Sequence, residues 1–98
     1  MKVEADYQAK LKKKIKERLP GAIVLKNDPT GMRGIPDLTV LYKDRWAALE
    51  TKREEKEEGK RKNQRYYVST MNEMSFARFI FPENEEDVLN ELEQALKL

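Results

Sequence analysis

Three charged residues interrupt two apolar segments of the chain, and their types and spacing are suited to phosphate chemistry. The segments are residues 34–42 and 46–52, separated by a short polar turn. Their β-branched and aromatic content on either side of that turn predicts a β-hairpin. Asp37 would start the first strand, and Glu50 and Lys52 would end the second.

The pairing register of this hairpin decides whether the three charges meet. Side chains alternate faces along a strand, so Glu50 and Lys52 point to the same side. If Lys43 pairs with Trp46, Asp37 lies opposite Lys52, with Glu50 as its diagonal neighbour. With a loop two residues longer, Asp37 faces Glu50 instead. Every even loop length places all three on one face, whereas an odd loop without a bulge would separate them.

Two carboxylates and one ammonium group on one patch suit a hard divalent cation. Mg²⁺ prefers oxygen ligands, and it usually combines one or two protein carboxylates with waters and substrate phosphate oxygens. Lys52 would offset the negative charge there and contact a phosphate or the attacking water. The structural alternative is a surface carboxylate–lysine cluster, which would contribute little to stability.

These residues carry a resemblance to a known family. The stretch Gly34-Ile35-Pro36-Asp37-Leu38, then Glu50-x-Lys52, then Gln64 resembles the PD-(D/E)XK nuclease superfamily. More narrowly, the chain resembles the VRR-NUC family, found as small virus-encoded proteins and as the nuclease domain of larger DNA-repair enzymes. The resemblance covers nearly the whole chain and implies one VRR-NUC-like nuclease domain over residues 1–98 with a restriction-endonuclease-like core.

The resemblance also implies an activity, namely Mg²⁺-dependent hydrolysis of DNA phosphodiester bonds, with Mn²⁺ as a substitute ion. Asp37 and Glu50 would bind the metal with help from the carbonyl group of Thr51. Lys52 would hold or deprotonate the attacking water. The Gln64 amide would position the water or the phosphate near the metal, although a glutamine at a helix start also commonly bonds to the backbone.

A predicted helix over residues 3–19 supplies the last candidate ligand. Its apolar row is Val3, Tyr7, Leu11, Ile15 and Leu19. Glu4 and Gln8 lie beside that row rather than on the lysine-rich side. The resemblance places an acid of the first helix at the metal site, and Glu4 matches best, with Asp6 as the fallback. From the residues alone, Glu4 fits equally well as a first-turn acid that complements the helix dipole.

The other elements complete an α/β pattern. The sequence predicts a strand over residues 22–26, a loop over 27–36, a helix over about 60–74, a strand over 75–81 and a last helix capped by Asn84. The inward row of the helix over 60–74 is Gln64, Val68 and Met71. The resulting order, αβββαβα, predicts a mixed β-sheet flanked by helices.

Basic residues near these elements are candidate DNA contacts. Arg33 lies in the glycine-containing loop, and four more open the helix that contains Gln64: Lys60, Arg61, Lys62 and Arg65. Residues 1–65 contain 18 Lys and Arg against 11 Asp and Glu, whereas residues 66–98 contain 2 against 7. This asymmetry suggests a face suited to a polyanion. Solvated helix faces explain the charges equally well.

The composition excludes several classes of chemistry. The chain has no cysteine and no histidine, so thiolate zinc sites, disulfides and histidine bases are absent. Any metal site must therefore use oxygen ligands. Residues 1–20 are charged throughout and no run is long enough to span a bilayer, so we expect no membrane contact and a cytoplasmic location. The resemblance suggests a viral protein in a bacterial host cell.

The expected substrate is branched DNA. One small domain offers one site, and symmetric cutting of two strands needs two, which a homodimer supplies. Stand-alone viral members of the family resemble four-way-junction resolvases, so the expectation is a homodimeric Holliday junction resolvase. The alternatives are a nuclease acting on flaps or linear DNA, a non-catalytic nucleic-acid-binding module, and a protein that only contacts other proteins.

Overall fold

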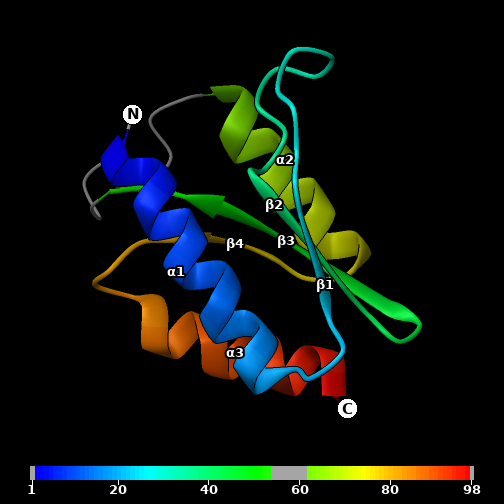
Figure 1. Ribbon diagram of the computed structural model, residues 1–98. Coiled ribbons are helices and arrows are strands. Elements are labelled where there is room, and N and C mark those ends of the chain that lie inside the picture. Colours follow the sequence, from blue (N-terminus) through cyan, green and yellow to red (C-terminus); the bar gives the residue numbers. More distant parts are fainter. Residues whose placement is uncertain (1, 54–61, 98) are drawn as a thin grey trace.

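The computed structural model describes residues 2–53 and 62–97, except for the side chains of residues 2–4. In chain order its elements are α1 (Lys2–Arg18), β1 (Ile23–Lys26), β2 (Leu38–Tyr42), β3 (Arg45–Thr51), α2 (Lys62–Met74), β4 (Ala77–Ile80) and α3 (Glu85–Lys97) (Figure 1). The α/β class and the order of the elements confirm the prediction.

The four strands form one mixed sheet in the order β1-β2-β3-β4. β1, β2 and β3 are antiparallel neighbours, as short connections allow, whereas β3 and β4 are parallel. A parallel pair needs a long crossover connection, and α2 lies within it. The crossover carries the chain from the end of β3 over one face of the sheet and back to the start of β4.

The β2–β3 hairpin closes through a two-residue turn. Tyr42 pairs with Arg45, and Lys43 has a φ of 56°, in the left-handed region that tight hairpin turns use. The sequence left two registers open, and the structure does not have the one that pairs Lys43 with Trp46, since Trp46 pairs with Leu41. The observed register is the alternative one, shifted by two residues along the strand, and it preserves the face of every side chain.

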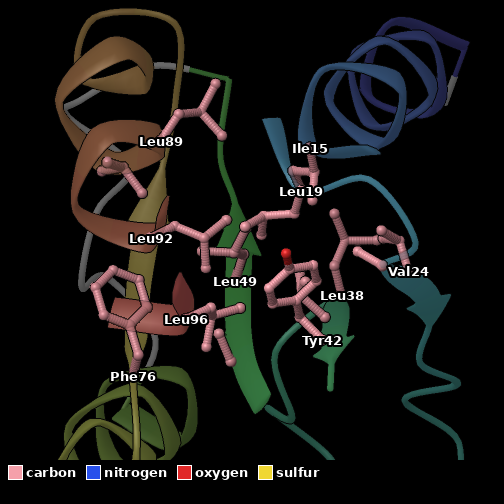
Figure 2. Packing of buried hydrophobic residues seen from close by; sticks show 14 of the residues in the cluster. Ile15, Leu19, Val24, Leu38, Tyr42, Leu49, Phe76, Leu89, Leu92 and Leu96 are labelled. Carbon is pink, nitrogen blue, oxygen red and sulfur yellow. The ribbon is translucent and has the colours of Figure 1, made fainter. Parts of the chain in front are cut away.

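Helices cover both faces of the sheet. α1 and α3 lie on one face and enclose the main core (Figure 1, Figure 2). The side chains of Ala47 and Leu49 in β3 belong to that core, whereas Ala48 packs with Val68 of α2 on the opposite face. Because strand side chains alternate, Glu50 is on the α2 side and Thr51 on the α1 side. α2 contacts β3 and β4.

The predicted apolar row of the first helix is confirmed where the structure describes it. Leu11, Ile15 and Leu19 are fully buried, and Tyr7 packs against the same core. The side chain of Val3 lies outside the described residues. Gln8 is buried beside this row, as its position on the helix predicted.

The start of α3 differs in detail from the prediction. The backbone carbonyl of Asn84 accepts a hydrogen bond from Val88 N, as expected at a helix start. The side chain of Asn84 does not cap the helix. It instead accepts from Phe81 N and donates to Phe79 O, so it ties the helix start back to β4. Within the described ranges, no helix has both the length and the apolar character needed to cross a membrane.

Candidate active site at the end of the sheet

Asp37 and Glu50 come together where β2 begins and β3 ends. Leu38 pairs with Leu49, so the next position along this register places Asp37 opposite Glu50. The Asp37 backbone is anchored, because its carbonyl accepts a hydrogen bond of 2.7 Å from Asn27 N. Residues opposite each other on antiparallel strands share a face, so both carboxylates belong to the α2 side.

The Asp37 carboxylate also completes the backbone pairing of β3. Its Oδ2 accepts from Thr51 N at 3.0 Å and from the Thr51 hydroxyl at 2.7 Å. The register would place Pro36 opposite Thr51, but the Pro36 carbonyl accepts from the Asn27 side chain at 2.9 Å. The Asp37 carboxylate therefore accepts the hydrogen bond that a backbone carbonyl of the neighbouring strand would otherwise accept. This bond holds the carboxylate against the end of β3.

Gln8 of α1 supports this arrangement from the other face of the sheet. Its Nε2 donates to Thr51 Oγ1 at 2.9 Å, so a chain of hydrogen bonds runs from Gln8 through Thr51 to Asp37. Gln8 is only 8% exposed. The sequence showed Gln8 on the inward side of its helix, but that alone did not identify Thr51 as its partner. The support that Gln8 gives to the site was missed for this reason.

Glu50 is a buried carboxylate with one unsatisfied oxygen. The residue is 2% exposed, and its Oε1 has no hydrogen-bond partner among the described residues. The pKa of Glu50 is raised to about 8, first by burial and second by the neighbouring charge of Asp37. The charge of Lys52 and hydrogen bonding to Lys52 and the Asp37 backbone oppose this shift. Two acids are thus held close together, with one of them removed from water.

Lys52 connects Glu50 to α2. Its Nζ lies 3.6 Å from Glu50 Oε2 and donates to Gln64 Oε1 at 2.5 Å. The backbone of Lys52 is also held, because its N donates to Ile80 O at 2.9 Å. The ammonium group is therefore placed beside the two carboxylates by contacts to both β3 and α2. Four sequence-predicted residues meet here: Asp37, Glu50, Lys52 and Gln64.

Gly34 allows the loop before Asp37 to sit against the start of α2. Its φ of +88° is one that side-chain-bearing residues rarely adopt. A Cβ atom at this position would lie 2.5 Å from Asn63 Cβ and 3.1 Å from Gln64 N. The loop that delivers Asp37 and the helix turn that carries Gln64 are thus in close contact, which only glycine permits.

The other predicted residues are not brought into this cluster by a described contact. Arg33 and Lys62 are exposed, and Arg65 is exposed but engaged in an interaction. Asp6 is exposed on α1. Lys60 and Arg61, and the side chain of Glu4, lie outside the described residues. Glu4 precedes Gln8, the residue of α1 that contacts Thr51, by one helical turn.

The cluster offers two carboxylates as possible ligands for a cation. In the part of the chain that the structure describes, no group of three or more Asp, Glu, His or Cys residues is arranged to hold a metal ion. Asp37 and Glu50 are two such donors, and both offer oxygen. The unpaired Oε1 of Glu50 and the repulsion between the two carboxylates are features that a hard divalent cation would relieve.

Comparisons of this chain with protein-family models, with curated proteins and with solved structures find no match, so its function is inferred from the geometry above and from the motif in the sequence.

Proposed function

We propose that this chain is a Mg²⁺-dependent endodeoxyribonuclease built on a restriction-endonuclease-like core. One observation carries the proposal: a buried carboxylate, Glu50, lies beside Asp37 at the end of adjacent strands, with the Lys52 ammonium 3.6 Å from it. The charge of Asp37 disfavours the ionised form of Glu50, and a cation held by both carboxylates would offset that repulsion.

The residues present fit a divalent ion with oxygen ligands. Asp37 and Glu50 would hold it, with the Thr51 carbonyl and Glu4 as the further ligands implied by the family resemblance. When bound, such an ion supplies Lewis-acid activation of a phosphodiester and of a water molecule. The orphaned Glu50 Oε1 is the observation that favours this donor set, because a buried acceptor without a partner is costly.

The protein groups then have distinct tasks in hydrolysis. In the net reaction the water oxygen bonds to phosphorus, the bond to the leaving sugar oxygen breaks, and a proton from water ends on that leaving oxygen. Lys52 stabilises the negative charge that develops on the phosphoryl oxygens. Gln64 holds the Lys52 ammonium in place through its amide oxygen. Thr51 and Gln8 keep the Asp37 carboxylate oriented.

The proposed substrate is branched DNA, and the proposed active form is a homodimer. Each chain supplies one cluster of Asp37, Glu50 and Lys52, whereas resolution of a four-way junction needs two cuts related by a two-fold axis. Arg33, Lys62 and Arg65 are the described residues proposed to contact the DNA backbone, and all three are exposed. Contacts of this type position DNA without reading its bases.

The decisive experiment offers the purified protein a labelled four-way junction and a matched linear duplex, each with Mg²⁺ and with a chelator. We expect Mg²⁺-dependent cutting of the junction, loss of cutting in Asp37→Asn and Glu50→Gln, and full cutting in Asp44→Asn, a matched change in the exposed turn. Sedimentation would give the oligomeric state.

Each other outcome of this experiment has a definite meaning. Equal cutting of both substrates removes the junction preference and leaves the nuclease. Binding of DNA without any cutting identifies a nucleic-acid-binding module. Neither cutting nor binding at low salt identifies a protein that contacts other proteins.

A further inference from the structure

Salt bridges between α1 and α3 set two of the basic residues of α1 apart from a second group. Lys14 pairs with Glu85, and Arg18 pairs with Glu86 at 2.6 Å and with Glu93 at 3.6 Å. These two residues lie on the side of α1 that faces α3. The acidic C-terminal part of the chain therefore neutralises only that side of the basic helix.

The second group is the lysine face, which we define as Lys12, Lys13 and Lys16. All three are exposed, and in the described part of the chain none of them has an ion pair or a side-chain hydrogen bond. They surround a shallow surface hollow together with Ala9 and Glu17. The small Ala9 side chain leaves room between the lysines, and the single acid, Glu17, leaves the hollow with a net positive charge.

The arrangement has an energetic cost in the free protein. Lys12 and Lys16 are four residues apart on the helix, and Lys13 and Lys16 are three apart, so their like charges are neighbours. Like charges at this spacing repel one another and destabilise a helix. An anionic group in the hollow would remove this repulsion, which is the condition expected of a phosphate-binding surface.

The position of the lysine face relates it to the candidate active site. Gln8, which contacts Thr51, is one helical turn before Lys12 and two turns before Lys16. With a rise of 1.5 Å per residue, these lysines lie about 6 and 12 Å further along the helix axis. A DNA strand has one phosphate per about 3.4 Å of duplex axis, so these offsets from Gln8 correspond to roughly two to four nucleotides.

We propose that the lysine face binds the phosphate backbone of a DNA duplex as it leaves the candidate active site. This is a second contact surface, distinct from Arg33, Lys62 and Arg65, because α1 and α2 cover opposite faces of the sheet. The choice of DNA as the polyanion rests on the proposed function. The binding itself does not require catalysis, so it is measured without metal.

The test compares two triple variants of the full chain that lose the same charge. In one, Lys12, Lys13 and Lys16 become Gln; in the control, Lys14, Lys43 and Lys97 become Gln. Affinity for a labelled linear duplex is measured by fluorescence anisotropy in chelator over a series of salt concentrations. Circular dichroism and thermal unfolding check that both variants fold like the parent.

The affinity of the parent should fall as salt rises, and this fall should be less steep in the lysine-face variant. We expect the magnitude of the slope of log affinity against log salt to decrease by about 2–3, since each phosphate contact contributes about 0.9 to it. The variant's affinity at low salt should fall at least tenfold, while the control keeps the parent slope. Equal slopes in all three proteins would overturn the proposal, and so would a parent that binds anionic vesicles but not DNA.

The two proposals fail separately in this design. If the parent cleaves DNA but the salt slope of the lysine-face variant is unchanged, DNA binding by the lysine face is refuted and the proposed nuclease activity stands. Binding that depends on the lysine face, without cleavage by the parent, would refute the nuclease and keep the surface.

Discussion

The carboxylate of Asp37 accepts two hydrogen bonds from Thr51, one from the backbone amide at 3.0 Å and one from the hydroxyl at 2.7 Å. A residue just before β2 thereby supplies, through its side chain, the acceptor for the last backbone amide of β3. The same contact orients an acid toward Glu50, so a feature that stabilises the sheet end also builds the candidate active site.

The two roles of Asp37 can be separated by substitution. Asp37→Ala leaves the partly buried Thr51 amide without its acceptor, so the free energy of unfolding should fall by about 1–3 kcal/mol. Asp37→Asn retains an acceptor oxygen and should cost less than about 1 kcal/mol, yet both variants should lose cleavage. Urea denaturation and the junction assay measure the two effects. Full activity in Asp37→Asn would contradict a role as a metal ligand.

Glu50 should make the free protein less stable as the pH rises. Its folded pKa of about 8 is above its usual value of 4.5, so the folded state binds this proton more tightly than the unfolded state. The stabilising contribution is complete below about pH 4.5 and is lost as the pH rises to about 8. Glu50→Gln should remove this slope, whereas Glu73→Gln, an exposed change on α2, should not. Thermal unfolding in chelator at pH 5 and pH 8.5 measures it.

Mg²⁺ should reverse this loss of stability. An ion bound by the folded state alone raises the midpoint of thermal unfolding in a concentration-dependent way. We expect the increase to be largest above pH 8, where Glu50 is ionised, and to disappear in Asp37→Asn and Glu50→Gln. An equal response to Mg²⁺ in the parent and in both variants would place cation binding elsewhere.

The contact between Lys52 and Gln64 predicts unequal effects on binding and cleavage. Gln64→Ala removes the acceptor that holds Lys52 Nζ at 2.5 Å, so cleavage should fall about tenfold to a hundredfold through misplacement of the ammonium group. Affinity for DNA in chelator should change less than threefold. Gln94→Ala, an exposed change on α3, is the matched control. A loss of affinity that fully accounts for the lost cleavage would instead make Gln64 a DNA-contact residue.

Gly34 should be intolerant of a methyl group, unlike Gly31. Gly34→Ala combines a φ of +88° with a contact of 2.5 Å to Asn63, so we expect a loss of about 1–3 kcal/mol in the free energy of unfolding and reduced cleavage. A Cβ at Gly31 meets nothing within 4 Å, and Gly31→Ala should be nearly neutral. Urea denaturation of the two variants checks this, and equal stability would show that the loop and α2 are not in tight contact.

Substitutions of Gln8 and Thr51 should have non-additive effects on the free energy of unfolding, because the two side chains share a hydrogen bond. Thr51→Val leaves the buried Gln8 amide unpaired, and Gln8→Leu removes a donor from the Thr51 hydroxyl, so each should cost about 1–3 kcal/mol. The double variant replaces both partners with apolar groups, and its cost should be smaller than the sum of the two. Strict additivity in urea denaturation would contradict the bond.

The amino-acid sequence alone predicted the order of the elements, and it predicted a shared face for Asp37, Glu50 and Lys52 on the condition that the hairpin loop has an even length. The physical reason is that side-chain alternation and helical periodicity are local, so any register shifted by two keeps each residue on its face. The same local pattern placed Gln8 and Gln64 on the inward sides of their helices. It could not choose between the two registers, because turn closure at Tyr42 and Arg45 depends on the paired strands.

Only the tertiary structure decided which groups meet and which are shielded from water. The burial of Glu50 depends on α2 lying over β3, and its raised pKa follows from that burial and from Asp37 across the strands. The pairing of Lys14 and Arg18 with α3 likewise determines which lysines of α1 remain for a partner. These contacts join residues as far apart in the chain as Arg18 and Glu93, and no local periodicity specifies them.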